Sequence, residues 1–90
     1  MRSYRATPHF RRALRKLSPD HKRDARAAFR WFKEDPFDPR LRPHKIQRLS
    51  AYYGRTIYAV DIAGDLRATF YIEGQTVWSV DIGTHDVYRG

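Results

Sequence analysis

The sequence contains no cysteine, so it offers neither a disulfide framework nor a thiolate metal site. It has no apolar run near the roughly 20 residues that a membrane-spanning helix needs, and its first ten residues lack the apolar segment of a secretory signal. Its four histidines show no H-x-x-x-H spacing, so a metal site is not expected. These absences predict a cytoplasmic protein that uses neither a metal nor a cofactor.

Acidic residues are scarce in the first half of the chain. The 90 residues carry 18 Lys and Arg against 10 Asp and Glu, a net charge of +8. Residues 1–48 hold 15 basic and 5 acidic residues, and residues 49–90 hold 3 and 5, so the halves carry +10 and −2. This field favours a polyanion such as nucleic acid, an acidic segment of a partner or an anionic membrane surface. A basic surface with no specific partner is the alternative.

The last third of the chain predicts three strands, over residues 56–62, 66–72 and 76–82. They are separated by the short links Ala-Gly-Asp and Glu-Gly-Gln, which indicate an antiparallel meander. In the middle strand, apolar residues alternate with Arg67, Thr69 and Tyr71. One face can therefore pack on a core while the other faces outward.

The first half predicts two helices. Thr7-Pro8 and Ser18-Pro19 are typical helix starts, the second helix covers residues 19–34, and apolar residues recur at helical spacing in both. A first strand is expected over residues 2–6 and a basic loop over residues 40–45. Residues 46–49 are expected to be a short strand or an extended lead-in, and residues 50–55 to bend the chain into the meander.

These elements predict one α+β domain over residues 1–90, in the order β-α-α-β-β-β. A two-helix hairpin would pack on one face of an antiparallel sheet, and the other face would stay open. If the alternation holds, the open face carries Ile57, Asp61, Arg67, Thr69, Tyr71, Val77, Ser79 and Asp81.

Three residues near the predicted sheet suggest chemistry, and each has a plainer interpretation. Arg67 can hold a phosphate with its guanidinium fork or simply pair with Asp61 or Asp81. His85 can act as a general acid or base or be a solvated residue after a strand. Tyr88 can stack on an unpaired base or be a rim aromatic.

The basic loop adds His44 and Lys45, with Arg48 beyond it, and these residues can position a phosphate with or without chemistry. His9 and His21 fall on the helices and are expected to be surface residues. Together with Arg67 and His85, the loop residues could support metal-free RNA cleavage. A base takes the proton of a ribose 2′-OH, a cation stabilises the phosphoryl oxygens and an acid protonates the leaving 5′-oxygen.

The element order, the run from Asp65 to Tyr71 and the ending DIGTHDVYR resemble the RelE/ParE superfamily of bacterial type II toxins over nearly the whole chain. The resemblance implies a small microbial-RNase-like domain that cuts mRNA without a metal, usually at the ribosome. Its partner would be an antitoxin whose flexible segment wraps the toxin, which is itself a monomer within that complex.

The resemblance also implies roles for residues of this chain. Arg67, His85 and Tyr88 match the family's catalytic positions, and the RNA-binding set would be His44, Lys45, Arg48, Arg55 and Tyr71. Two features depart from the family: Tyr88 lies three residues after His85 where many active members have four, and Lys45 is the one lysine after Lys33. The alternatives are a ParE-like toxin that inhibits DNA gyrase, an inactive relative, and a small nucleic-acid-binding module.

Overall fold

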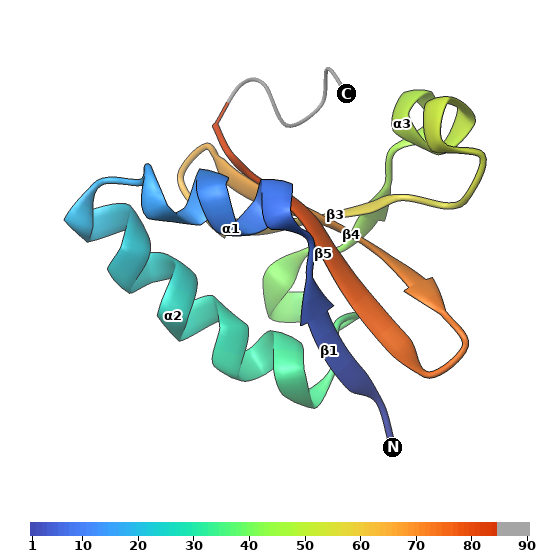
Figure 1. Cartoon of the computed structure of the whole chain (residues 1–90). Helices are drawn as coiled ribbons and strands as arrows, with labels where there is room; N and C mark the ends of the chain where they lie inside the picture. Colours follow the sequence, from blue (N-terminus) through green and yellow to red (C-terminus); the bar gives the residue numbers. More distant parts are fainter. Residues whose placement is uncertain (85–90) are drawn as a thin grey trace.

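A five-stranded sheet with helices against both of its faces forms the part of the chain that the computed structural model describes, residues 1–84 (Figure 1). In chain order the elements are β1 (Ser3–Ala6), α1 (Pro8–Arg15), α2 (Pro19–Glu34), the 3-10 turn η1 (Pro39–Leu41), β2 (His44–Lys45), α3 (Gln47–Tyr53), β3 (Tyr58–Ala63), β4 (Leu66–Glu73) and β5 (Thr76–Gly83). The α+β class and the order of strand, helical hairpin and three-strand meander are confirmed. Within residues 1–84, no helix is long and apolar enough to cross a membrane.

The sheet is mixed rather than antiparallel. Its strand order is β1-β5-β4-β3-β2, and β1 runs parallel to β5, whereas the other neighbours are antiparallel. The prediction of an antiparallel sheet is therefore wrong for β1. A parallel pair needs a long connection, and the helical hairpin, β2 to β4 and their links together provide one between β1 and β5.

Both helices of the hairpin begin where the Ser/Thr-Pro signals predict. Thr7 Oγ1 accepts a hydrogen bond from the Phe10 N–H at 3.0 Å, and Ser18 Oγ accepts one from the His21 N–H at 3.1 Å. The apolar side of the hairpin packs on one face of the sheet, which we call the inner face. The buried core comprises Phe10, Ala25, Ala28, Phe32, Leu41, Val60, Leu66, Ala68, Phe70, Val77 and Ile82. This core fixes β3, β4 and β5 and so fixes the side chains on their other face.

The segment after the basic loop is a helix, which the sequence did not predict. Residues 47–53 form α3 where a strand or lead-in and a bend were expected. Its start lacks a side-chain cap, and it ends at Gly54, whose φ of 70° suits a glycine at a helix end. Ser50 Oγ donates to the Ile46 carbonyl and accepts from the Ile57 N–H, both at 2.8 Å, so one hydroxyl ties the helix to the start of the meander.

The face of the sheet away from the hairpin, which we call the outer face, is only partly open. Figure 1 shows α3 on this side. Ile57 is fully buried, and so are Ala59 and Thr69 in the middle of the outer face, while Leu49 of α3 is also buried. These residues form a second, smaller apolar layer beneath α3. The prediction that Ile57 and Thr69 are exposed on an open face is therefore wrong, because α3 covers them.

A β-bulge changes which residues of β5 face outward. The register between β4 and β5 shifts so that Phe70 opposes Ser79 while Thr69 opposes Asp81, which leaves Val80 as the extra residue. An extra residue reverses the alternation of sides along a strand. Val77 and Ser79 therefore lie on the inner side, against prediction, and Trp78 takes their place on the outer face. Asp61, Arg67, Tyr71 and Asp81 lie on the predicted side.

Candidate functional site

Arg67 lies on the outer face, near the start of β4, and its guanidinium is held in place. Its Nη1 donates to the carbonyl oxygens of Gly64 at 2.6 Å and Leu66 at 3.3 Å. Its Nε lies 2.8 Å from Oδ1 of Asp61, the residue directly opposite on β3. The side chain is 23% exposed, so it is neither buried nor freely moving in solvent. The structure thus contains the Arg67–Asp61 pair that was the plainer of the two interpretations of this arginine.

Asp61 is shared between two arginines. Its Oδ2 lies 3.7 Å from Nε of Arg42, in addition to the contact between Oδ1 and Arg67. Oδ1 is buried, and the Arg67 N–H is too poorly aligned to make a hydrogen bond to it, so within residues 1–84 this oxygen has an ion pair but no hydrogen bond. Two cations around one carboxylate leave a net positive charge, which suits a phosphate.

Arg42 also orients His44. Its φ and ψ of 50° and 52° are left-handed, and among the described residues other than glycine it alone has a positive φ. Such a conformation costs about 1–2 kcal/mol for a residue with a side chain, and it is often found at functional sites. The Arg42 carbonyl oxygen lies 3.0 Å from Nδ1 of His44. Because a carbonyl can only accept, the neutral ring carries its hydrogen on Nδ1, and Nε2 is its basic nitrogen.

The strand pairing separates His44 from Lys45. His44 is opposite Ala59, which is opposite Thr69, which is opposite Asp81, so these four residues form one row across the outer face. Lys45 is opposite Tyr58, whose ring stacks on Phe70 of the core, so Lys45 falls on the inner side of the sheet. Only His44 of the predicted loop pair therefore shares a face with Arg67.

We call this part of the outer face the arginine end and define it by Arg42, His44, Asp61 and Arg67. It also lies next to the end of β5, because Gly83 is opposite Arg67. The predicted residues His85 and Tyr88 lie outside the described residues. Arg48 is an exposed residue of α3.

The other two predicted RNA-binding residues meet at the opposite end of the face. The guanidinium carbon of Arg55 lies 4.2 Å above the ring of Tyr71, and its Nη1 is 3.2 Å from Oε2 of Glu73. Tyr71 stacks in turn on Trp78, with ring centroids 6.4 Å apart and planes inclined by 21°. We call Arg55, Tyr71, Glu73 and Trp78 the aromatic end.

Tyr71 lies four positions after Arg67 on β4, which is roughly 13 Å of strand. The predicted site is therefore two groups rather than one. Sequence reasoning missed Arg42 and Trp78: the first is placed by a left-handed turn, and the second by the β-bulge. Among residues 1–84, no cluster of His, Cys, Asp and Glu could hold a metal ion.

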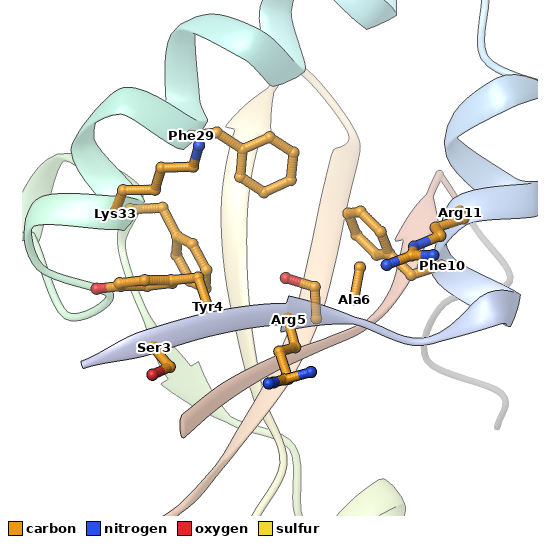
Figure 2. A pocket seen from close by; sticks show the side chains of 10 residues that line it. Ser3, Tyr4, Arg5, Ala6, Phe10, Arg11, Phe29 and Lys33 are labelled. Carbon is orange, nitrogen blue, oxygen red and sulfur yellow. The ribbon is translucent and has the colours of Figure 1, made fainter. Parts of the chain in front are cut away.

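A groove of about 470 Å³ lies on a different part of the molecule, along the edge of β1 that does not pair with β5 (Figure 2). Its floor is apolar and includes Phe10, Phe29 and Phe32, while Arg5, Arg11 and Lys33 bring three positive charges to its lining. Figure 2 shows Phe29 and Lys33 of α2 above the strand and Arg5 turned away from α2.

The backbone of β1 also offers hydrogen bonds to this groove. The Ser3 N–H donates to the carbonyl of Gln75, just before β5, at 2.8 Å, and the Thr7 N–H donates to the carbonyl of Ser79 in β5 at 3.0 Å. In a parallel pair, successive N–H groups point alternately toward and away from the neighbouring strand. Those of Tyr4 and Ala6 therefore point away from β5. Such an edge can pair with an additional strand.

Comparison with known proteins finds similarity in structure but not in sequence. No model of a known protein family matches the chain, and no curated protein matches it by sequence. Several solved structures are similar in fold, among them the following three. YafQ from Escherichia coli strain BL21(DE3) matches with a TM-score of 0.76 at 12% identity, over 100% of both chains.

The other two structures are complexes. The archaeal RelE–RelB complex from Pyrococcus horikoshii OT3 matches with a TM-score of 0.70 at 13% identity, over 92% of this chain and 93% of that one. The E. coli DinJ–YafQ complex matches with a TM-score of 0.67 at 14% identity, over 100% of both chains. At sequence identities this low, structural similarity establishes the fold and nothing further. This chain has the fold of the RelE-like toxins.

Proposed function

We propose that this protein is the toxin of a type II toxin-antitoxin system and that it cleaves mRNA, at the ribosome, without a metal. The observation that carries the proposal is the arginine end, where the fixed guanidinium of Arg67 lies on the same exposed sheet face as His44. A fold shared with YafQ over the whole chain, and with RelE over 92% of it, supports the proposal. So does the excess of positive charge.

The arginine end contains groups that could promote RNA cleavage by attack of a ribose 2′-OH on the adjacent phosphate. A phosphate oxygen takes the place of the Asp61 carboxylate at Nε of Arg67, while the contacts to the Gly64 and Leu66 carbonyls keep the guanidinium plane in position. A histidine removes the 2′-OH proton, the 2′-oxygen bonds to phosphorus, and the bond to the 5′-oxygen breaks as that oxygen gains a proton. The products are a 2′,3′-cyclic phosphate and a 5′-hydroxyl. His44 and His85 are the proposed acid and base, and Tyr88 and the aromatic end hold flanking nucleotides.

The Arg67–Asp61 pair also favours a second candidate. An arginine neutralised by a neighbouring carboxylate is what a toxin-fold protein without RNase activity would have, including one that inhibits DNA gyrase. The two candidates differ in what they do to RNA.

The test is induced expression in a bacterium with primer extension on a reporter mRNA, and a supercoiling assay with purified gyrase in parallel. Growth arrest with new 5′ ends on the mRNA and no effect on gyrase supports the RNase. Arrest without cuts, together with inhibited supercoiling, would replace it with the gyrase-inhibiting candidate. No arrest and no cuts would leave an inactive relative.

We propose that the partner is an antitoxin with an acidic, extended segment that lies in the groove along β1. RelE and YafQ are each found in complex with another protein, RelB and DinJ. In this chain the groove combines an apolar floor, a strand edge and three cations, and none of the residues among 1–84 that line it is acidic. An extended segment can pair with Tyr4 and Ala6 and place alternate side chains over Phe29 and Phe32.

Charge reversal tests this docking surface. Lys33→Glu should weaken the affinity of the toxin for the protein encoded beside it, because it places a negative charge next to an acidic segment. Lys22→Glu is the matched control, since Lys22 lies on the same helix but lines a different pocket, with Leu14, Arg15 and Arg26. Equal affinities for the two variants in titration calorimetry would rule out this groove.

A further inference from the structure

His9 and Asp81 form a polar pair that the proposed reaction has not used. Nε2 of His9 lies 3.1 Å from Oδ1 of Asp81. The same oxygen accepts the Ile82 N–H at 2.8 Å, so the carboxylate is fixed to its own backbone. His9 is 61% exposed and Asp81 24%. The ring is therefore open to solvent while the group that orients it is held in the sheet.

The strand register places this pair beside the arginine end. Asp81 is opposite Thr69, and Gly83 is opposite Arg67, with no bulge between these two rows. Asp81 and Arg67 are thus diagonal neighbours on one face, with their Cα atoms roughly 7–8 Å apart. His9, at the start of α1, reaches Asp81 beyond the point where β1 ends.

Two imidazoles then flank one guanidinium. His44 on β2 and Asp81 on β5 are the outer members of one row, and Arg67 on β4 lies between them in the next row. A phosphate held by Arg67 would have His44 toward β2 and His9 toward β5. Cleavage by a 2′-OH needs an acid and a base on opposite sides of the phosphorus, because the attacking and leaving oxygens lie roughly in line.

The surroundings of Asp81 suit a group that orients a histidine. Because a carboxylate only accepts, Nε2 of His9 carries a hydrogen, and the lone pair of the neutral ring is on Nδ1. Other titratable groups also lie near this carboxylate. Lys16 and His21 line the same pocket as Asp81, and Tyr53 belongs to α3. Burial raises the pKa of the Tyr53 phenol, and the negative charge of Asp81 raises it further. The pocket that Asp81 lines has a volume of about 410 Å³, so there is space beside the pair.

Capping of α1 does not account for the pair. Thr7 already caps this helix through its hydroxyl, and that hydroxyl also donates to the Val80 carbonyl at 3.1 Å. Asp81 contacts the side chain of His9 and not a free N–H of the first turn. An exposed ring held by a half-buried carboxylate is the arrangement of a general acid or base.

We propose that His9 is a catalytic acid or base of the RNA cleavage and that Asp81 is its positioning residue. This inference rests on the proposed RNase function. His9 exchanges one proton with the reacting ribose-phosphate: it takes the proton of the 2′-OH as the 2′-oxygen bonds to phosphorus, or it gives one to the 5′-oxygen as that bond breaks. His44 performs the other transfer.

The test is single-turnover cleavage of an mRNA on purified ribosomes. His9→Gln should lower the rate by about 10²-fold or more, which is the usual contribution of a positioned acid or base. It should also remove one limb of the pH–rate profile. Asp81→Asn should lower the rate less and keep both limbs. Arg12→Gln is the control, since Arg12 is exposed on the same helix as His9 and lines neither the pocket beside Asp81 nor the groove along β1, and this variant should cleave at the wild-type rate.

Chemical rescue separates catalysis from folding. Added imidazole should restore part of the activity of His9→Ala, which a structural role would not allow. A His9→Gln enzyme that cleaves at the wild-type rate, or one whose lost activity imidazole leaves unchanged in His9→Ala, would overturn the inference.

The experiments distinguish failure of the proposed RNase function from failure of the proposed role of His9. A wild-type protein that cuts no RNA overturns both proposals. Cleavage that Arg67→Ala abolishes and His9→Gln leaves intact overturns only the role of His9.

Discussion

The two ends of the outer sheet face share strand β4 but differ in the side chains that they present. At the arginine end, charged side chains are paired across β3 and β4, and backbone carbonyls fix the arginine. At the aromatic end, two rings are stacked and a guanidinium lies over one of them. The first arrangement suits charge that develops during a reaction, and the second suits flat, neutral surfaces such as bases. This comparison predicts that residues of the arginine end affect the cleavage rate, whereas residues of the aromatic end affect RNA binding.

Removing the guanidinium at the arginine end should have the largest effect. We expect Arg67→Ala to lower the cleavage rate on the order of 10²–10³-fold, as loss of a donor to a developing oxyanion does. The control is Arg55→Ala, which removes a guanidinium with a comparable ion pair from the aromatic end. Both rates are measured at saturating mRNA-programmed ribosomes. Equal losses in the two variants would contradict the separation of the two ends.

Changes at the aromatic end should act on binding. Tyr71→Leu keeps an apolar side chain on β4 but removes the ring between Arg55 and Trp78. We expect it to weaken RNA binding by about 1–3 kcal/mol, the usual value of one base-stacking contact, with the cleavage rate at saturation unchanged. Fluorescence anisotropy with a short single-stranded RNA measures the first, and the single-turnover assay the second. A fall in the saturated rate alone would place Tyr71 with the catalytic group.

The smallest effect concerns α3, which covers the middle of the face between the two ends. The raised pKa of Tyr53 means that its phenol keeps its proton in the folded state at a pH where the unfolded chain, with a pKa of 10.0, has lost it. The folded state then binds more protons at this group, so the contribution of Tyr53 to the free energy of unfolding is constant below pH 10 and falls as pH rises above 10.

Tyr53→Phe should reduce the loss of folding stability above pH 10. The measurement is urea unfolding at pH 8 and at a pH above 10, for the wild type and the variant. The control is Tyr52→Phe, because Tyr52 lies next to Tyr53 on the same helix and is 75% exposed, whereas Tyr53 is partly covered at 43% exposed. Identical pH dependence in all three proteins would contradict the placement of Tyr53 near Asp81.

Much of the inner side could be read from the sequence. The Ser/Thr-Pro starts of α1 and α2, the apolar stripe of α2 and the alternation along β4 are local signals, and the structure agrees with each. The helix α3 was missed because its start lacks a side-chain cap. Its one clear local signal is Gly54, which follows two tyrosines and ends the helix. Leu49 and Ser50 stabilise α3 through contacts with distant residues.

The sequence predicted which types of residue form the candidate site better than it predicted how these residues are arranged. Arg67 and Tyr71 lie on the outer face as expected, but Arg55 and Tyr71 form a separate group from Arg67. Lys45 falls on the inner side because its strand has two residues and its partner is Tyr58. His9 was expected to be a plain surface residue, and only its contact with Asp81 suggests a role. The proposed roles of His85 and Tyr88 remain predictions.

By itself the sequence determined the class of fold, the helical hairpin, the three main strands and the excess of positive charge, because helix caps, alternation and composition are local properties of the chain. Only the tertiary structure decided that β1 pairs parallel with β5 and that α3 covers the middle of the outer face. It also decided which charges meet. The physical reason is that alternation assigns side chains to faces only until a bulge adds a residue. Ion pairs such as Arg67–Asp61 and His9–Asp81 depend on a register that no single strand encodes.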